Sequence, residues 1–210
     1  MNKGKLLALT LSVVGCIIFA ITINQMKSYG MGLGALDSLS LAVVSLTAIE
    51  KFGNASLLLQ SFCLLIMVLL ISKLKVSKVS LIISFVSIFA LTRVINLFSY
   101  FNYEQSFTIV TIVTTFLLMN FGLYLIARSN LIIPPYDKLI VELASLLNFD
   151  IGIFRVIIDC SILFIVILLN VLLSSEVPIT IATLILTFGT GTNIAIYLKL
   201  EFLIKNKIER

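Results

Sequence analysis

The sequence predicts an all-α polytopic membrane protein. We expect six transmembrane helices arranged as two inverted three-helix repeats, each with an amphipathic or re-entrant helix. Three observations lead to this prediction: an apolar composition, six apolar runs of helical length, and a duplicated segment that contains an aspartate. Of the 210 residues, 60% are hydrophobic and 12% are charged, and the mean hydropathy is +1.18. Soluble domains carry about 25% charged residues, and a chain this short cannot bury so much apolar surface in its own core.

The apolar runs that we expect to cross the membrane lie at residues 6–24, 55–72, 79–99, 107–127, 151–173 and 177–198. Each is close to the ~20 residues that a helix needs to cross ~30 Å of hydrocarbon. None alternates between apolar and polar residues as membrane-spanning strands do. The first run begins as a signal peptide would, but it continues past Cys16 to Ile23, which favours an uncleaved span.

The distribution of basic residues predicts a multi-pass protein of the bacterial plasma membrane with both termini in the cytoplasm. With that orientation, the following eleven basic residues lie inside: Lys3, Lys5, Lys73, Lys75, Lys78, Arg128, Lys138, Lys199, Lys205, Lys207 and Arg210. Only Lys27 and Lys51 lie outside. The net charge of +5 then reflects topology, so the expected partner is the lipid bilayer and no nucleic acid is invoked.

Two segments one hundred residues apart share an arrangement. Residues 32–37 read Gly-Leu-Gly-Ala-Leu-Asp and residues 132–137 read Ile-Ile-Pro-Pro-Tyr-Asp, and an amphipathic run and a long apolar run follow each of them. Because three spans per half is an odd number, the second half must enter the membrane upside down relative to the first. We therefore expect a single membrane domain with a first repeat at 1–103 and a second repeat at 104–210.

The amphipathic segments cover residues 34–52 and 134–149, and their apolar side chains follow the 3.6-residue period of a helix. Each segment can lie flat in the membrane interface, or it can enter the membrane as a re-entrant half-helix shielded by its neighbours. A full crossing by the first segment would make the repeats parallel. Glu50, Lys51 and the hydroxyl side chains of that segment argue mildly against a full crossing.

These motifs resemble the YczE/YyaS/YitT-type family of bacterial integral membrane proteins. The resemblance rests on the duplicated Gly- or Pro-rich loop that ends in an aspartate, and on Arg155 and Asp159 near the start of the fifth span. It covers roughly residues 15–195. In the first copy Ala35 stands where the family loop has a proline, and the second copy lacks the glycines. The resemblance implies a transporter-like or otherwise uncharacterised membrane protein.

Six polar or charged residues near the predicted spans are candidates for binding a solute: Asp37, Asp137, Arg93, Arg155, Asp159 and Asn193. A charge inside the bilayer costs about 3 kcal/mol on insertion scales, so such residues are usually paired within the protein. The two aspartates of the duplicated loops are expected at helix N-termini. There a carboxylate can cap free N–H groups or form a cation or proton site.

The other candidates also have a structural and a functional interpretation. Arg155 precedes Asp159 by one helical turn, so the two can form a structural clamp. Alternatively, Asp159 lies beside a solute path and an arginine binds a negative group on the solute. Asn193 ends a run of two glycines and two threonines at 189–192, which is compatible with a broken helix beside a cavity or with close helix packing.

The working hypothesis is a small-solute transporter or permease whose path lies between the two repeats, near these six residues. Two alternatives stay open. The chain could be the substrate-binding membrane subunit of a multi-component ATP-driven importer, with an ATPase complex as its partner. It could also be a non-transporting accessory or regulatory membrane protein. The sequence is compatible with a homo-oligomer as well.

An enzyme is not expected. The chain has no histidine, so a Ser–His or Cys–His pair and an imidazole metal site are excluded. It has no glycine motif for binding a nucleotide either. The three cysteines fall in predicted spans without CxxC spacing and are expected to pack as small apolar residues. No metal and no cofactor is predicted.

Overall fold

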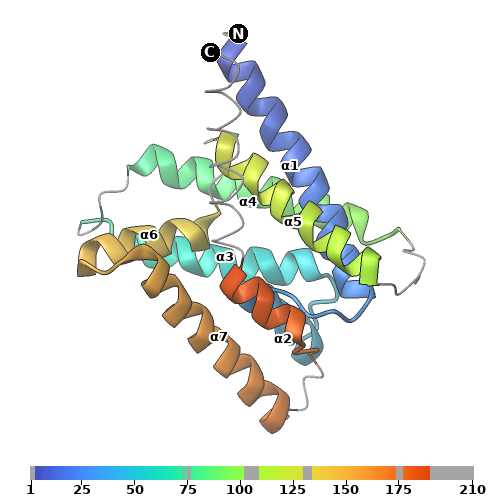
Figure 1. Cartoon of the computed structure of the whole chain (residues 1–210). Coiled ribbons are helices and arrows are strands. Elements are labelled where there is room, and N and C mark those ends of the chain that lie inside the picture. The colour runs from blue at the N-terminus through green and yellow to red at the C-terminus, as the bar shows by residue number, and fades with distance from the viewer. Residues whose placement is uncertain are drawn as a thin grey trace, which may run out of the picture.

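The computed structural model describes residues 3–72, 74, 77–101, 109–129, 134–173 and 177–189, and within these ranges it is helical and contains no strand (Figure 1). The helices are α1 (Lys3–Ser28), α2 (Ala35–Leu46), α3 (Phe52–Leu69), α4 (Lys78–Phe98), α5 (Ile109–Ser129), α6 (Pro135–Leu147) and α7 (Ile151–Leu173). A further helix covers residues 181–189.

Five of the six predicted spans are confirmed as helices long and apolar enough to cross a membrane, namely α1, α3, α4, α5 and α7. The sixth run, 177–198, is helical over 181–189 and continues outside the described residues. The expected boundary between the repeats, at 103/104, also lies outside them.

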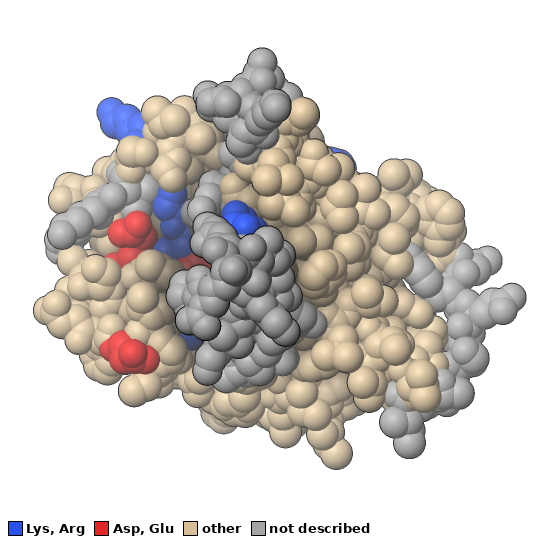
Figure 2. Space-filling view, turned by 45° about the horizontal axis from the view of Figure 1, so that its top comes forward, with Lys and Arg blue, Asp and Glu red and all other residues tan. Residues whose placement is uncertain are grey.

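Much apolar surface is exposed on these helices. On the face shown in Figure 2, uncharged residues form most of the surface that is not grey. Along α7, which lies at one edge of the structure in Figure 1, Phe164, Val171 and Leu172 are 61%, 74% and 73% exposed. Soluble monomers rarely expose large contiguous apolar patches. The exposed surface is therefore consistent with a multi-pass membrane protein.

The two amphipathic segments form short helices. α2 has 12 residues and α6 has 13, so at 1.5 Å per residue each reaches about 20 Å, well short of the ~30 Å hydrocarbon core. α2 ends at Leu46 rather than near residue 52, which rules out a full crossing by this helix. α6 begins with Pro135, whose fixed φ suits a first helical position. It is followed by Asn148, whose φ of 55° makes a left-handed cap.

α1 and α5 cross in backbone contact at two glycines. A Cβ atom on Gly15 would lie 2.8 Å from the carbonyl oxygen of Gly122, and one on Gly122 would lie 3.0 Å from the backbone nitrogen of Phe19. Because neither residue has a side chain, the two helices approach closely. Around this crossing, α1, α4 and α5 form the largest apolar cluster, which includes the fully buried Ile23 and Ile126.

The two short helices pack against long helices from the other half of the sequence. α2 packs on α7 as well as on α3, and α6 packs on α3 as well as on α7. The turn before α2 lies against residues 178–183, where Thr180 Oγ1 donates a hydrogen bond to the carbonyl oxygen of Met31 at 2.6 Å. Gly32, with a φ of +71°, lies in the same turn, in the left-handed region that favours glycine. These contacts direct the N-termini of α2 and α6 into one region.

Candidate functional site

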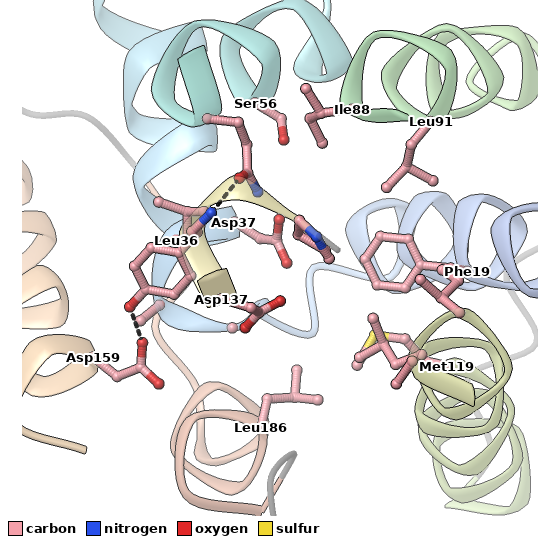
Figure 3. A pocket seen from close by; sticks show the side chains of 18 of the residues that line it. Phe19, Leu36, Asp37, Ser56, Ile88, Leu91, Met119, Asp137, Asp159 and Leu186 are labelled. Atoms are coloured by element: carbon pink, nitrogen blue, oxygen red, sulfur yellow. Dashed lines mark hydrogen bonds between the residues drawn. The ribbon is translucent and has the colours of Figure 1, made fainter. Parts of the chain in front are cut away.

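A pocket of about 400 Å³ lies where α2 and α6 approach α1, α3, α4, α5 and α7. Asp37 and Asp137 lie in the first turns of α2 and α6, and both carboxylates point into the pocket (Figure 3). Leu186 and Thr187 of the helix at 181–189 line it too. The pocket therefore combines residues from both halves of the chain.

A network of charged and polar side chains borders one side of the pocket. Arg155 Nη2 lies 2.8 Å from Asp137 Oδ1, and Arg155 Nε lies 3.6 Å from Asp159 Oδ2. The hydroxyl of Tyr136 donates a hydrogen bond to Asp159 Oδ1. One guanidinium is therefore shared by two carboxylates, and the network joins α6 to α7.

Gln60 joins α6 to α3 in the same region. Its Oε1 atom accepts a hydrogen bond of 2.9 Å from the backbone N–H of Tyr136. That N–H lies in the first turn of α6, where the helix itself supplies no acceptor. Gln60 thus satisfies one free N–H group of the helix N-terminus, whereas Asp137 forms its ion pair with Arg155 instead. The capping hydrogen bond expected of Asp137 is not formed with the described residues.

Asp37 differs from the other two carboxylates. Among the described residues it has neither an ion pair nor a hydrogen bond. Burial, with the negative charges of Asp137 and Asp159 adding to it, raises the pKa of Asp37 to about 7. Near neutral pH this carboxyl group can therefore gain or lose a proton.

The rest of the pocket is largely apolar. Facing Asp159 across the pocket in Figure 3 are Phe19, Leu91 and Met119. The other apolar lining residues on α4 and α5 and in the helix at 181–189 are Ile88, Ile95, Leu123, Ile126, Ala127 and Leu186. The pocket thus has a charged side and an apolar side.

The structure brings together four of the six predicted site residues: Asp37, Asp137, Arg155 and Asp159 all line the pocket. It does not bring Arg93 there. That side chain is exposed, its guanidinium lies 4.7 Å from the ring centroid of Phe89, and it borders a separate groove beside the start of α3. Asn193 lies outside the described residues.

A model for a family of unknown function, DUF6198, matches residues 6–199. The chain belongs to this family. Every residue that lines the pocket lies within the matched range, so the DUF6198 region contains the whole candidate site. No curated protein and no solved structure matches the chain. Nothing in the family match connects the chain to the YczE/YyaS/YitT-type family that its loop motifs resemble.

Four polar residues of the DUF6198 pocket are not among the predicted site residues: Tyr136, Gln60, Ser56 and Thr187. The predicted repeat could have pointed to two of them. Gln60 and Ser56 lie 99 residues before Asp159 and Arg155, respectively, so the predicted repeat would pair these positions of α3 and α7. Tyr136 directly precedes Asp137, but only the packing of α6 on α7 shows that its hydroxyl reaches Asp159.

Asp37→Asn is expected to stabilise the DUF6198 protein more at pH 8 than at pH 5. The pKa of Asp37 in the folded protein, about 7, is above the ~3.9 of an unfolded aspartate. The folded state therefore binds this proton more tightly, and the wild type loses stability as the pH rises from about 4 to 7. Asparagine cannot ionise, so we expect the variant to gain about 2 kcal/mol relative to the wild type between pH 5 and pH 8.

The measurement is the thermal unfolding midpoint of the purified protein in detergent at both pH values. Ser56→Ala is the matched control, because it changes the same pocket without removing a titratable group. The charged groups near Asp37 are Asp137 and Asp159 and Arg155, which also lines the pocket. A stability difference between Asp37→Asn and the wild type that is the same at both pH values would contradict this prediction.

Proposed function

We propose that this DUF6198 protein is a small-solute transporter or permease of the bacterial plasma membrane, and that the solute passes through the pocket between the two halves. The observation that carries this proposal is the convergence of Asp37 and Asp137 on one pocket of about 400 Å³. They come from two short helices in different halves of the sequence. Short helices whose N-termini meet at a polar site between repeats are typical of secondary transporters.

An inverted repeat is part of the proposal, and the packing supports it. α2 of the first half packs on α7 of the second, just as α6 of the second half packs on α3 of the first. Reciprocal contacts of this kind are what a two-fold axis produces. Three pairs of equivalent positions line the pocket: Asp37 with Asp137, Ser56 with Arg155, and Gln60 with Asp159. An axis in the membrane plane, together with the basic loops, would place both termini in the cytoplasm.

The test is whether a cysteine in the pocket can be reached from each side of the membrane. The three native cysteines, Cys16, Cys63 and Cys160, are first replaced by alanine or serine. Ser56→Cys then places one thiol in the pocket lining. Ser84→Cys is the matched control, because Ser84 is 2% exposed and does not line the pocket.

Right-side-out and inside-out vesicles are treated with a charged thiol reagent that does not cross the membrane, and the modified fraction is measured. We expect Ser56→Cys to react from both sides, because a transporter opens its site to each side in turn. Ser84→Cys should react from neither side. Reaction of Ser56→Cys from neither side in folded protein would contradict transport and favour the accessory protein. Reaction from the outside alone would favour a binding subunit, which should then co-purify with an ATPase.

A further inference from the structure

The pocket contains more negative than positive charge. Three carboxylates line it, and Arg155 is the one basic side chain among its described lining residues. That arginine lies 2.8 Å from Asp137 and 3.6 Å from Asp159, so two carboxylates already share it. Asp37 has no ion pair or hydrogen bond with the described residues. When Asp37 is ionised, its charge is therefore uncompensated within the described pocket.

Two classes of solute are disfavoured, anions by the charge of the pocket and metal ions by its arrangement of ligands. An anion would approach three carboxylates, and the guanidinium that could bind it is already paired with two of them. The interpretation in which an arginine of this site binds a negative group is therefore disfavoured. A bound metal ion needs several ligand atoms that converge on it. The described residues contain no group of three or more Asp, Glu, His or Cys side chains placed to hold one.

The apolar side of the pocket indicates that a positively charged solute should also have an apolar part. Phe19, Leu91 and Met119 lie across the pocket from the carboxylates (Figure 3). The ring of Phe19 can also attract a positive charge through its face. The volume of about 400 Å³ is within the ~300–1,000 Å³ of small-molecule pockets. A solute with one positive charge and an apolar body would match both sides.

We propose that the pocket selects small amphiphilic organic cations, such as primary amines with an apolar body. The ammonium group binds at Asp37, beside Asp137, and the apolar body packs on Phe19, Leu91 and Met119. This inference rests on the proposed function, for which it names the substrate class. Asp37 is then the binding residue, while the paired Asp137, Arg155 and Asp159 hold the charged side of the pocket in place.

The experiment compares three probes of similar size and different charge: 2-phenylethylamine, 2-phenylethanol and 3-phenylpropanoate. Binding to the purified full-length protein is measured by isothermal titration calorimetry at pH 8, where Asp37 is mainly ionised. We expect the amine to bind at least tenfold more tightly than the alcohol, and no binding of the carboxylate. Asp37→Asn should weaken amine binding at least tenfold and leave alcohol binding unchanged. Glu142→Gln, which removes an acid outside the pocket lining, should bind the amine as the wild type does.

Three outcomes would overturn the inference: the carboxylate or the alcohol binds as tightly as the amine, Asp37→Asn keeps the wild-type affinity for the amine, or folded wild type binds none of the probes. Uptake of the amine into proteoliposomes separates this inference from the proposed function. In one case the amine binds but is not taken up, and the thiol reagent reaches Ser56→Cys from one side only. The proposed ligand class is then supported and the proposed transport is contradicted. If Ser56→Cys is reached from both sides but the amine does not bind, transport stands and the ligand class fails.

Discussion

Arg155→Leu is expected to lower the free energy of unfolding by about 2–4 kcal/mol. The variant removes the positive charge 2.8 Å from Asp137 and 3.6 Å from Asp159, and the side chain of Asp159 is only 7% exposed. Removing one partner of a buried ion pair costs about 3–5 kcal/mol, because the other charge stays buried and unpaired. The side chains of Arg155 and Asp137 are 30% and 33% exposed, so the expected loss is somewhat smaller.

The measurement is equilibrium unfolding of the purified protein in mixed micelles. Arg155→Lys is the first control, since it keeps the charge but loses the fork of donors that reaches two carboxylates; it should be less destabilised than Arg155→Leu. Adding Asp137→Asn to Arg155→Leu should recover part of the stability, because one unpaired charge is removed. If Arg155→Leu is as stable as the wild type, the network does not contribute to folding.

Gly53→Ala is expected to cost about 2–3 kcal/mol. Gly53 lies in the first turn of α3, where its N–H donates a hydrogen bond of 2.9 Å to Asn96 Oδ1 on α4. A Cβ atom at this position would lie 2.5 Å from the carbonyl oxygen of Thr92, which belongs to the backbone of α4 and cannot rotate away. Forcing an extra methyl group into a packed interface typically costs about 1–3 kcal/mol, and the shift would also weaken the hydrogen bond to Asn96.

Gly152→Ala provides the matched control for Gly53→Ala. Gly152 lies 99 residues after Gly53 in the sequence and in the first turn of α7. A Cβ there would meet only Asp150 Oδ1, at 3.2 Å, and that atom ends a flexible side chain. Alanine is favoured over glycine in helices by up to about 1 kcal/mol, so Gly152→Ala should be neutral or stabilising. Equal losses of unfolding midpoint in the two variants would show that the contact between α3 and α4 does not determine the effect.

The sequence predicts the long helices well and the site in part. A run of about twenty apolar residues has few alternatives to a spanning helix, so the positions of α1, α3, α4, α5 and α7 follow from composition alone. Asp37 and Asp137 could be found because each ends a duplicated loop. Whether such a carboxylate caps its helix or reaches a distant partner depends on packing. For Asp137, the partner is on α7.

Arg93 shows what an apolar run does not reveal. Arg93 and Arg155 both lie in or beside predicted spans, and a hydropathy scale gives the two residues the same value. The face on which each side chain lies depends on the neighbouring helices. α4 turns Ile88, Leu91 and Ile95 toward the pocket and leaves Arg93 exposed beside Phe89. The end of α2 at Leu46 was also not predicted, because the apolar period continues beyond it to Ile49.

The hydrogen bond between Thr180 and Met31 has a consequence for biosynthesis. The two residues are 149 positions apart, so this contact cannot form until all the residues between them have been made and have left the ribosome. Thr187, which lines the pocket, is made later still. The early helices can insert one by one, but the pocket is complete only after the helix at 181–189 has been made. A chain that stopped after α7 would have its five long helices and three pocket carboxylates. The pocket beside Asp37 would lack the side chains of Leu186 and Thr187.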